Sequence, residues 1–333
     1  MTSASMQLSP DRIQYLKKRK QQKSQAQVIL LITSIVAAVI FLCLLIAVIA
    51  NANVLFKSDA PNTPASQTTP TQSATLQPYD TPSSGKAAGP LILVNSSHAY
   101  VFPETTDNLV SIFSNRTPYV NPETSEVYYS YKVSGSSLLM DVKALNALNS
   151  WMDAFYAETN ERDAIVNSAY RTFEEQKSLN SEIHAGYSDS HTGYLISLKV
   201  YKESTTYSLT DPKVKDTYQW LTDNCYKYGF VVRYPEGKEA KTGVSDYTYA
   251  FRYVGVPHAT YMHDHNLCLE EYIELLHEYL HTGEHLTINT TAGKYEVFYI
   301  PASTESNTTI YKTDSAIVSG DNDSGFIITI PIS

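Results

Sequence analysis

Cysteine is scarce in this 333-residue chain, which contains three such residues. Cys43 lies in an apolar run near the N-terminus, so only Cys225 and Cys268 remain in the rest of the chain. Two cysteines cannot form the dense framework of a disulfide-stapled domain. We expect two separate buried thiols, and a single bridge between Cys225 and Cys268 is the alternative.

Positive charge is also in short supply. The chain has 25 lysines and arginines against 34 aspartates and glutamates, which gives a formal net charge of −9. A protein that binds nucleic acid would need a basic surface to neutralise phosphates. The composition therefore argues against nucleic acid as a partner.

Long hydrophobic runs are absent except at residues 28–50, which are uncharged and almost wholly apolar. At about 1.5 Å per residue, this run is long enough to cross a hydrocarbon core of about 30 Å. Positive residues before a span favour a cytoplasmic N-terminus. We expect a basic cytoplasmic tail at 1–27 and an uncleaved transmembrane signal anchor at 28–50, so that the protein is a single-pass component of the cell membrane with its remainder extracellular. A cleaved signal peptide is the alternative. The basic residues before the run are Arg12, Lys17, Lys18, Arg19, Lys20 and Lys23.

Residues 51–90 are rich in proline, serine and threonine and have few apolar side chains. Such a composition is typical of an extended spacer, because too little apolar surface is available to offset the entropy of ordering. We interpret this segment as a linker.

Residues 91–333 suffice for one globular domain, and their pattern indicates an α+β fold. Strands are expected at 91–95, 164–168 and 230–234. Helices are expected at 141–158, after Thr172 as N-cap, from 211 to a stop at Gly229, and at 268–281. After residue 285 the apolar pattern alternates with period two at 295–300 and 326–330, around a turn at 321–325. Residues 286–333 are therefore expected to form a small C-terminal antiparallel β appendage.

Several short motifs follow one another in the folded part. They are Ser-Ala-Tyr-Arg-Thr at 168–172, Tyr-Gly-Phe-Val-Val-Arg-Tyr-Pro at 228–235, Phe-Arg-Tyr-Val-Gly at 251–255 and Leu-Cys-Leu-Glu-Glu-Tyr at 267–272. Together with residues 182–198, they resemble VanY-type D-alanyl-D-alanine carboxypeptidases, a bacterial zinc peptidase family that trims peptidoglycan stem peptides in the cell wall. The resemblance implies a mixed α/β zinc D,D-carboxypeptidase-like domain at 91–285. The order and spacing of the motifs make the resemblance specific.

The residues that would hold zinc in this family are replaced. A zinc peptidase needs three protein ligands and a carboxylate near the bound water. The resemblance places the ligand positions at Ser190, Ser197 and Ala250, and the position of the general base at Tyr247. None of these side chains can take over the family role. We therefore expect no catalytic residues and no cofactor, although zinc is the cofactor that the family implies.

Other polar residues are candidates for a rearranged zinc site, and an active D,D-carboxypeptidase that uses them is the alternative. His191 should point away from Ser190 if the segment is extended. We interpret the His-Asp-His sequence at 263–265 as a solvated turn before a helix. The further candidates are His184, Asp189, Asp246 and His258.

The residues that would hold the substrate are retained. The resemblance implies that Arg171, Gln176 and Ser188 lie in the cleft, and the fork of an arginine suits a terminal carboxylate. A structural salt bridge is the alternative role for Arg171. Arg233 and Arg252 are expected to serve packing and internal hydrogen bonds.

We therefore hypothesise a catalytically inactive, membrane-anchored extracytoplasmic binding module whose partners are peptidoglycan stem peptides or cell-wall proteins. A purely structural scaffold, with a cleft filled by its own side chains, is a further alternative.

Overall fold

The computed structural model describes residues 75–179, 181–245, 247 and 249–332. The predicted cytoplasmic tail and membrane anchor lie outside these residues. Within the described part of the chain, no helix is both long and apolar enough to cross a membrane.

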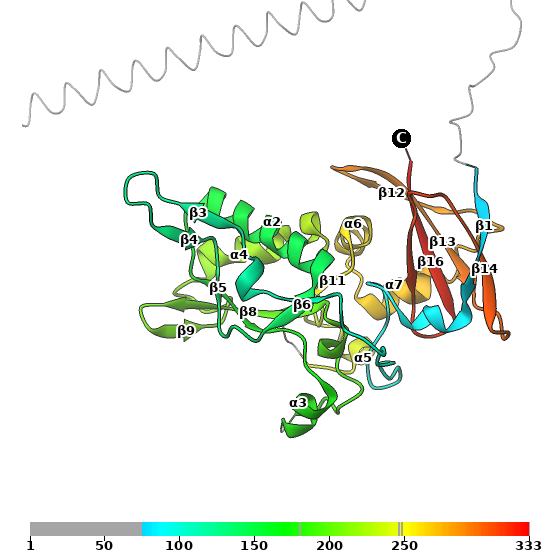
Figure 1. The fold of residues 1–333 in the computed structure, drawn as a ribbon, viewed down its shortest axis with the longest axis horizontal. Coiled ribbons are helices and arrows are strands. Elements are labelled where there is room, and N and C mark those ends of the chain that lie inside the picture. Colours follow the sequence, from blue (N-terminus) through cyan, green and yellow to red (C-terminus); the bar gives the residue numbers. More distant parts are fainter. Residues whose placement is uncertain (1–74, 180, 246, 248, 333) are drawn as a thin grey trace, which may run out of the picture. The chain divides into compact units, whose positions relative to one another are not determined.

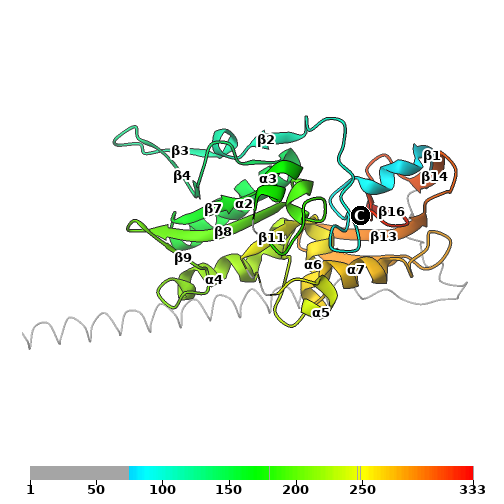
Figure 2. The same cartoon turned by 90° about the horizontal axis from the view of Figure 1, so that it is seen from below.

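A six-stranded sheet forms the centre of the larger half of the fold (Figures 1 and 2). Its order is β10-β11-β8-β7-β5, and β9 pairs with β8 outside this path. The pairing of β5 with β7 is parallel, and the other pairings are antiparallel. The strands are β5 (Lys132–Val133), β7 (Ala164–Ser168), β8 (Leu195–Lys202), β9 (Thr205–Tyr207), β10 (Phe230–Val232) and β11 (Ala250–Tyr253).

One face of this sheet is covered by helices α2 (Val142–Thr159) and α4 (Lys215–Asn224). Trp151 on α2 is fully buried, and its ring centroid lies 5.1 Å from those of both Phe230 and Phe251. Because side chains alternate along a strand, the residues between the core positions of β7 and β8 point to the opposite face. That opposite face contains the candidate site.

A second sheet, of order β12-β13-β16-β15, is antiparallel throughout. It shares a hydrophobic core with helices α6 (Val256–Asp264) and α7 (Leu269–Leu276), so the predicted appendage is packed against the preceding part of the domain. The antiparallel β prediction is confirmed, and residues 321–325 form the expected turn. The strands are β12 (Leu286–Thr290), β13 (Gly293–Pro301), β15 (Ile317–Gly320) and β16 (Gly325–Ile332).

Shorter elements complete the described fold. Strand β2 (Leu109–Ser111) pairs with β6 (Leu139–Asp141), and β3 (Pro118–Val120) pairs with β4 (Val127–Tyr129). The remaining helices are α3 (Phe173–Ser178), α5 (Glu239–Thr242) and the 3-10 turns η1 (Ser83–Ala87), η2 (Phe113–Asn115), η3 (Asp189–Thr192) and η4 (Cys225–Tyr228).

The helix predictions succeed where capping residues are present. Asp141 caps α2, Thr172 forms a capping box with Glu175 at the start of α3, and Gly229 ends the η4 turn with φ 83°. The predicted helices at 211–228 and 268–281 are shorter in the structure. Cys225 and Cys268 are buried free thiols, as expected.

Part of the predicted linker is folded. Strand β1 (Gln77–Pro82) pairs with β14 (Asn307–Lys312) in the C-terminal half of the chain. The prolines that suggested a spacer are tolerated because β1 is an edge strand with a single neighbour. The linker interpretation is therefore wrong for residues 77–82.

The expected strand at 91–95 is also corrected. This segment is buried but belongs to no sheet, and only an isolated bridge joins Asn95 to His98. Side chains take the place of a neighbouring strand: Arg252 donates to the carbonyl oxygens of Pro90 and Ile92 at 3.0 and 3.1 Å. A buried carbonyl that is satisfied by a guanidinium needs no ladder partner.

A buried ion cluster joins these segments. Asp189 is inaccessible to solvent and accepts hydrogen bonds from Arg233 Nε at 2.5 Å and from Arg252 Nη1. Arg233 also contacts Glu270 on α7 at 2.7 Å. Burial lowers the pKa of Arg252 to about 9, so the group stays cationic at neutral pH. Two carboxylates thus balance two guanidiniums, as expected for the packing role predicted for Arg233 and Arg252.

We predict that Asp189→Asn lowers the free energy of unfolding by about 3–5 kcal/mol, because it leaves two buried guanidiniums without their shared carboxylate. Urea denaturation measures the change. Glu274→Gln is the matched control, since it breaks an exposed ion pair with Lys241 and should leave the midpoint close to that of wild type. A similar midpoint for both variants would contradict the prediction.

His258 adds a second buried polar link, between α6, α7 and β16. Its Nδ1 lies 2.7 Å from the Tyr272 hydroxyl, and its Nε2 lies 2.9 Å from Thr329 Oγ1. Burial lowers the pKa of His258 to about 3. Below about pH 6.5 the imidazole takes up a proton in the unfolded chain, whereas the buried imidazole of the folded chain stays neutral. Protonation therefore favours the unfolded chain, and the free energy of unfolding decreases as the pH falls below about 6.5.

We predict that acidification from pH 7 to pH 4 removes about 3 kcal/mol of stability through this one group. His258→Gln should make the free energy of unfolding correspondingly less dependent on pH, as measured by urea titrations at several pH values. His263→Gln, which changes an exposed histidine, should keep the wild-type slope. An unchanged slope in His258→Gln would refute the assignment.

Candidate functional site

The candidate site is a cleft on the open face of the central sheet, where strands β7, β8 and β11 lie side by side. Their register places Ser168 opposite Ser197, and Ser197 opposite Ala250. The hydroxyls of Ser168 and Ser197 are 2.8 Å apart. The cavity has a volume of about 360 Å³, so it is not filled by the chain's own side chains. Its lining consists of Asn167, Ser168, Arg171, Gln176, Leu179, Ser181, Ile183, Ser188, Ser190, Leu195, Ser197, Lys199, Tyr234, Tyr247, Tyr249 and Ala250.

The η3 turn presents Ser190 to the cleft and turns its neighbours away. The Ser188 hydroxyl accepts a hydrogen bond from the Ser190 amide at 3.3 Å. Gly193 ends the turn with φ 74°, and a Cβ atom there would lie 2.5 Å from Leu109 Cδ2. Only glycine meets both constraints without a shift of the neighbours.

His191 points away from the cleft, as predicted, although the segment is a 3-10 turn and not extended. Its Nδ1 donates to the Arg171 carbonyl oxygen at 2.7 Å, and its Nε2 accepts from the Gly186 amide at 3.0 Å. Burial lowers the pKa of His191, which favours this neutral form. The imidazole therefore orders the backbone beneath the cleft and has no free nitrogen for a metal.

Arg171 is held at the edge of the cleft by Gln176. Its Nη1 donates to Gln176 Oε1 at 3.1 Å, and the Gln176 amide in turn donates to the Ile183 carbonyl oxygen at 2.8 Å. Arg171 makes no salt bridge within the described part of the chain, so the alternative structural role is not seen there. Burial lowers the pKa of Arg171, yet a guanidinium remains charged at neutral pH. Its remaining donors are available to a ligand.

The four positions to which the resemblance assigns the zinc ligands and the base all line this cleft. They hold the hydroxyls of Ser190 and Ser197, the methyl group of Ala250 and the phenol of Tyr247. Zinc in proteins is bound by thiolate, imidazole or carboxylate groups. The donor set therefore does not fit the metal.

None of the alternative ligands that the structure describes lines the cleft. Asp189 is occupied by two guanidiniums, and His258 by two hydroxyls. His263 and His265 stack on Tyr226 and Tyr261 at the exposed end of α6. Asp246 lies outside the described residues.

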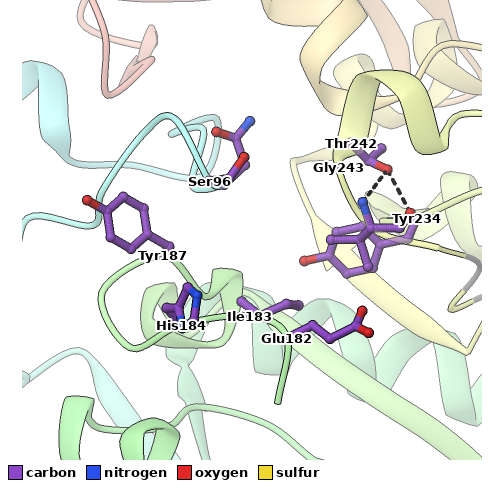
Figure 3. A pocket seen from close by; sticks show the side chains of 10 residues that line it. Ser96, Glu182, Ile183, His184, Tyr187, Tyr234, Thr242 and Gly243 are labelled. Atoms are coloured by element: carbon purple, nitrogen blue, oxygen red, sulfur yellow. Dashed lines mark hydrogen bonds between the residues drawn. The ribbon is translucent and has the colours of Figure 1, made fainter.

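His184 lines a neighbouring cavity of about 140 Å³, not the cleft itself. Figure 3 shows His184 and Glu182 on one side of this smaller cavity, with Tyr234 and Thr242 on the other. Ile183 and Tyr234 belong to the walls of both cavities. His184 and Glu182 therefore lie beside the cleft.

The described residues contain one other group with metal-binding side chains, formed by His277, Asp321 and Asp323. It lies at the turn before β16, away from the cleft. Both oxygens of Asp321 already accept hydrogen bonds, from backbone amides at 2.8–3.0 Å and from His277 at 2.9 Å. This group holds the turn in shape.

Sequence reasoning did not place several of the lining residues in the cleft, among them Ser168 and Lys199. Lys199 lies two positions after Ser197 on β8, and strand alternation alone would have placed it on the same face. Ser168 lies in a recognised motif, but its contact with Ser197 depends on an irregular register between β7 and β8.

Comparison with known proteins shows which sequences and structures the chain resembles. A sequence model of the VanY family, described as D-alanyl-D-alanine carboxypeptidase, matches residues 137–256. A D-alanyl-D-alanine carboxypeptidase of Enterococcus faecium is 31% identical over 251 residues, which cover 73% of this chain and 75% of the relative. A putative carboxypeptidase of Bacillus subtilis, YodJ, is 32% identical over 165 residues, covering 45% of this chain and 59% of that protein.

Among solved structures, the D,D-dipeptidase VanXYg superposes with a TM-score of 0.62 at 22% sequence identity and covers 78% of this chain and 100% of its own. This likeness confirms the mixed α/β fold. The relative from Enterococcus faecium shows that the chain belongs to the VanY-type D-alanyl-D-alanine carboxypeptidase family.

Proposed function

We propose that this chain uses the cleft of a D,D-carboxypeptidase to bind peptides that end in D-Ala-D-Ala, and that it does not hydrolyse them. The observation that carries the proposal is the combination of an open cleft with a charged Arg171 and three ligand positions without zinc-binding side chains. Peptidoglycan stem peptides are the ligand class that the family suggests.

Arg171 would provide the recognition. A guanidinium can donate two parallel hydrogen bonds to a carboxylate, and such charge-assisted contacts are stronger than neutral ones. Gln176 holds the guanidinium from one side, which limits the side-chain entropy lost on binding. Ser188 and Ser190 supply hydroxyl groups at the same wall of the cleft.

The apolar run at 28–50 supports the further proposal that a membrane anchor holds this cleft outside the cell. Protease treatment of intact cells should then digest the folded domain and spare residues 1–27. A mature chain that begins near residue 51 would instead indicate a cleaved signal peptide.

We predict that Arg171→Ala weakens the binding of an N-acetylated D-Ala-D-Ala dipeptide by about ten- to a hundredfold, since a charge-assisted contact contributes about 1.5–3 kcal/mol. Arg171→Lys should recover only part of the loss, because an ammonium lacks the fork. Isothermal titration calorimetry measures both. Arg162→Ala, which removes an arginine stacked on Tyr128, is the control and should bind normally. No heat of binding by folded wild-type protein would overturn the proposal.

We also predict that the purified protein contains no stoichiometric zinc and that added zinc leaves its melting temperature unchanged. The combined variant Ser190→His, Ser197→Asp, Ala250→His and Tyr247→Glu should gain zinc. The same variant with Ala250 retained should bind the metal much more weakly, because the ligands act together. One zinc per wild-type chain, measured by elemental analysis after dialysis, would favour the alternative of an active enzyme with a rearranged site.

A further inference from the structure

The cleft has a charge that contrasts with the rest of the protein. The chain as a whole carries a formal charge of −9, yet no aspartate or glutamate appears among the described residues that line the cleft. Two cationic residues, Arg171 and Lys199, line the same cavity. Among the described residues, the lining of the cleft is therefore cationic, and Glu182 lines the adjoining cavity.

Strand alternation places Lys199 on the face of the sheet that lines the cleft. On β8, Leu198 and Val200 are buried in the core beneath α2, so Ser197 and Lys199 face the cleft. The Lys199 side chain is half-buried, because the sheet shields one side of it from water.

No described residue neutralises the charge of Lys199 with a salt bridge. Other lysines on this sheet have carboxylate partners: Lys132 contacts Asp163 at 2.7 Å, and Lys202 contacts Glu161 at 3.1 Å. Lys199 forms no hydrogen bond or salt bridge within the described ranges. Its ammonium group is available to a ligand, just as the Arg171 guanidinium is.

Hydroxyl groups complete an anion-binding surface between these cations. The hydroxyls of Ser168 and Ser197 share one hydrogen bond at 2.8 Å, which consumes one of their two hydrogens. The second hydrogen remains for an acceptor on the ligand. Serine at position 197 also avoids the negative charge that an aspartate would place next to Lys199.

We propose that the cleft selects ligands with two anionic groups, the C-terminal carboxylate at Arg171 and a second carboxylate at Lys199. This inference rests on the proposed function for the first carboxylate and adds a second point of recognition. The expected ligands are diacidic peptides that end in D-Ala-D-Ala. Peptides that would place a cationic group at Lys199 should bind less tightly, because like charges repel.

Three dipeptide probes of similar shape test the second point. N-acetyl-D-Ala-D-Ala carries one carboxylate, N-succinyl-D-Ala-D-Ala carries two, and the methyl ester of the succinyl group restores the bulk without the second charge. For the wild-type protein, calorimetry at low salt should show the succinyl peptide binding about fivefold more tightly than the other two, and the advantage should shrink as salt is added.

Lys199→Gln should remove this advantage, so that the succinyl peptide and its methyl ester bind with equal affinity. Lys202→Gln is the matched control, because it removes the same charge from the same strand outside the cleft, and it should keep the wild-type ratio. Equal affinities of the wild type for the three probes, or an unchanged ratio in Lys199→Gln, would overturn the inference even if the acetyl peptide binds.

Inorganic phosphate separates a failure of this inference from a failure of the proposed function. If none of the peptides binds, the proposed function fails, and the anion site is judged by phosphate alone. Phosphate should then raise the melting temperature of the wild type relative to chloride at equal ionic strength, and Lys199→Gln should lose this rise while Lys202→Gln keeps it. No rise that depends on Lys199 would overturn the anion site as well.

Discussion

The fold depends on the pairing of one buried carboxylate, that of Asp189, with the guanidiniums of Arg233 and Arg252. Through these arginines, the η3 turn is tied to β10, β11 and the carbonyl groups of residues 90, 92 and 94. Glu270 extends the cluster to α7. The turn that forms one wall of the cleft is thus fixed from behind by groups that never face the cleft.

This arrangement explains how the scaffold can keep its shape while the residues of the metal site change. Ser190 faces the cavity, whereas Asp189, which precedes it in the η3 turn, is buried in the ion cluster. Arg252, two residues after Ala250 on β11, is also buried and is not among the residues that line the cavity. Substitution at Ser190, Ser197 or Ala250 can alter the chemistry of the cavity without breaking the ion cluster, because none of these side chains belongs to it. The proposed function, binding without catalysis, is compatible with such a scaffold.

Much of this could be read from the sequence, since local signals are strong where they occur. Thr172 and Gly229 mark helix ends by their own backbone and side-chain chemistry, and the motif register brought the four altered positions into one cleft. Pairings between segments that lie far apart in the sequence could not be predicted from it. Nothing local shows that residues 77–82 pair with a strand 230 residues later, or that guanidiniums replace a neighbouring strand at residues 91–95. The role of Lys199 could be recognised only when the alternation of β8 and the residues that line the cavity were both known.

Under the proposed function, the cleft binds peptide without a metal and without bond cleavage. The most direct test is to titrate the protein with a pentapeptide that ends in D-Ala-D-Ala in the presence of a chelator, and then to recover the peptide for mass spectrometry. We predict a saturable heat of binding that the chelator does not change, with the peptide recovered intact. Release of D-alanine without the chelator, and its loss when the chelator is added, would contradict it.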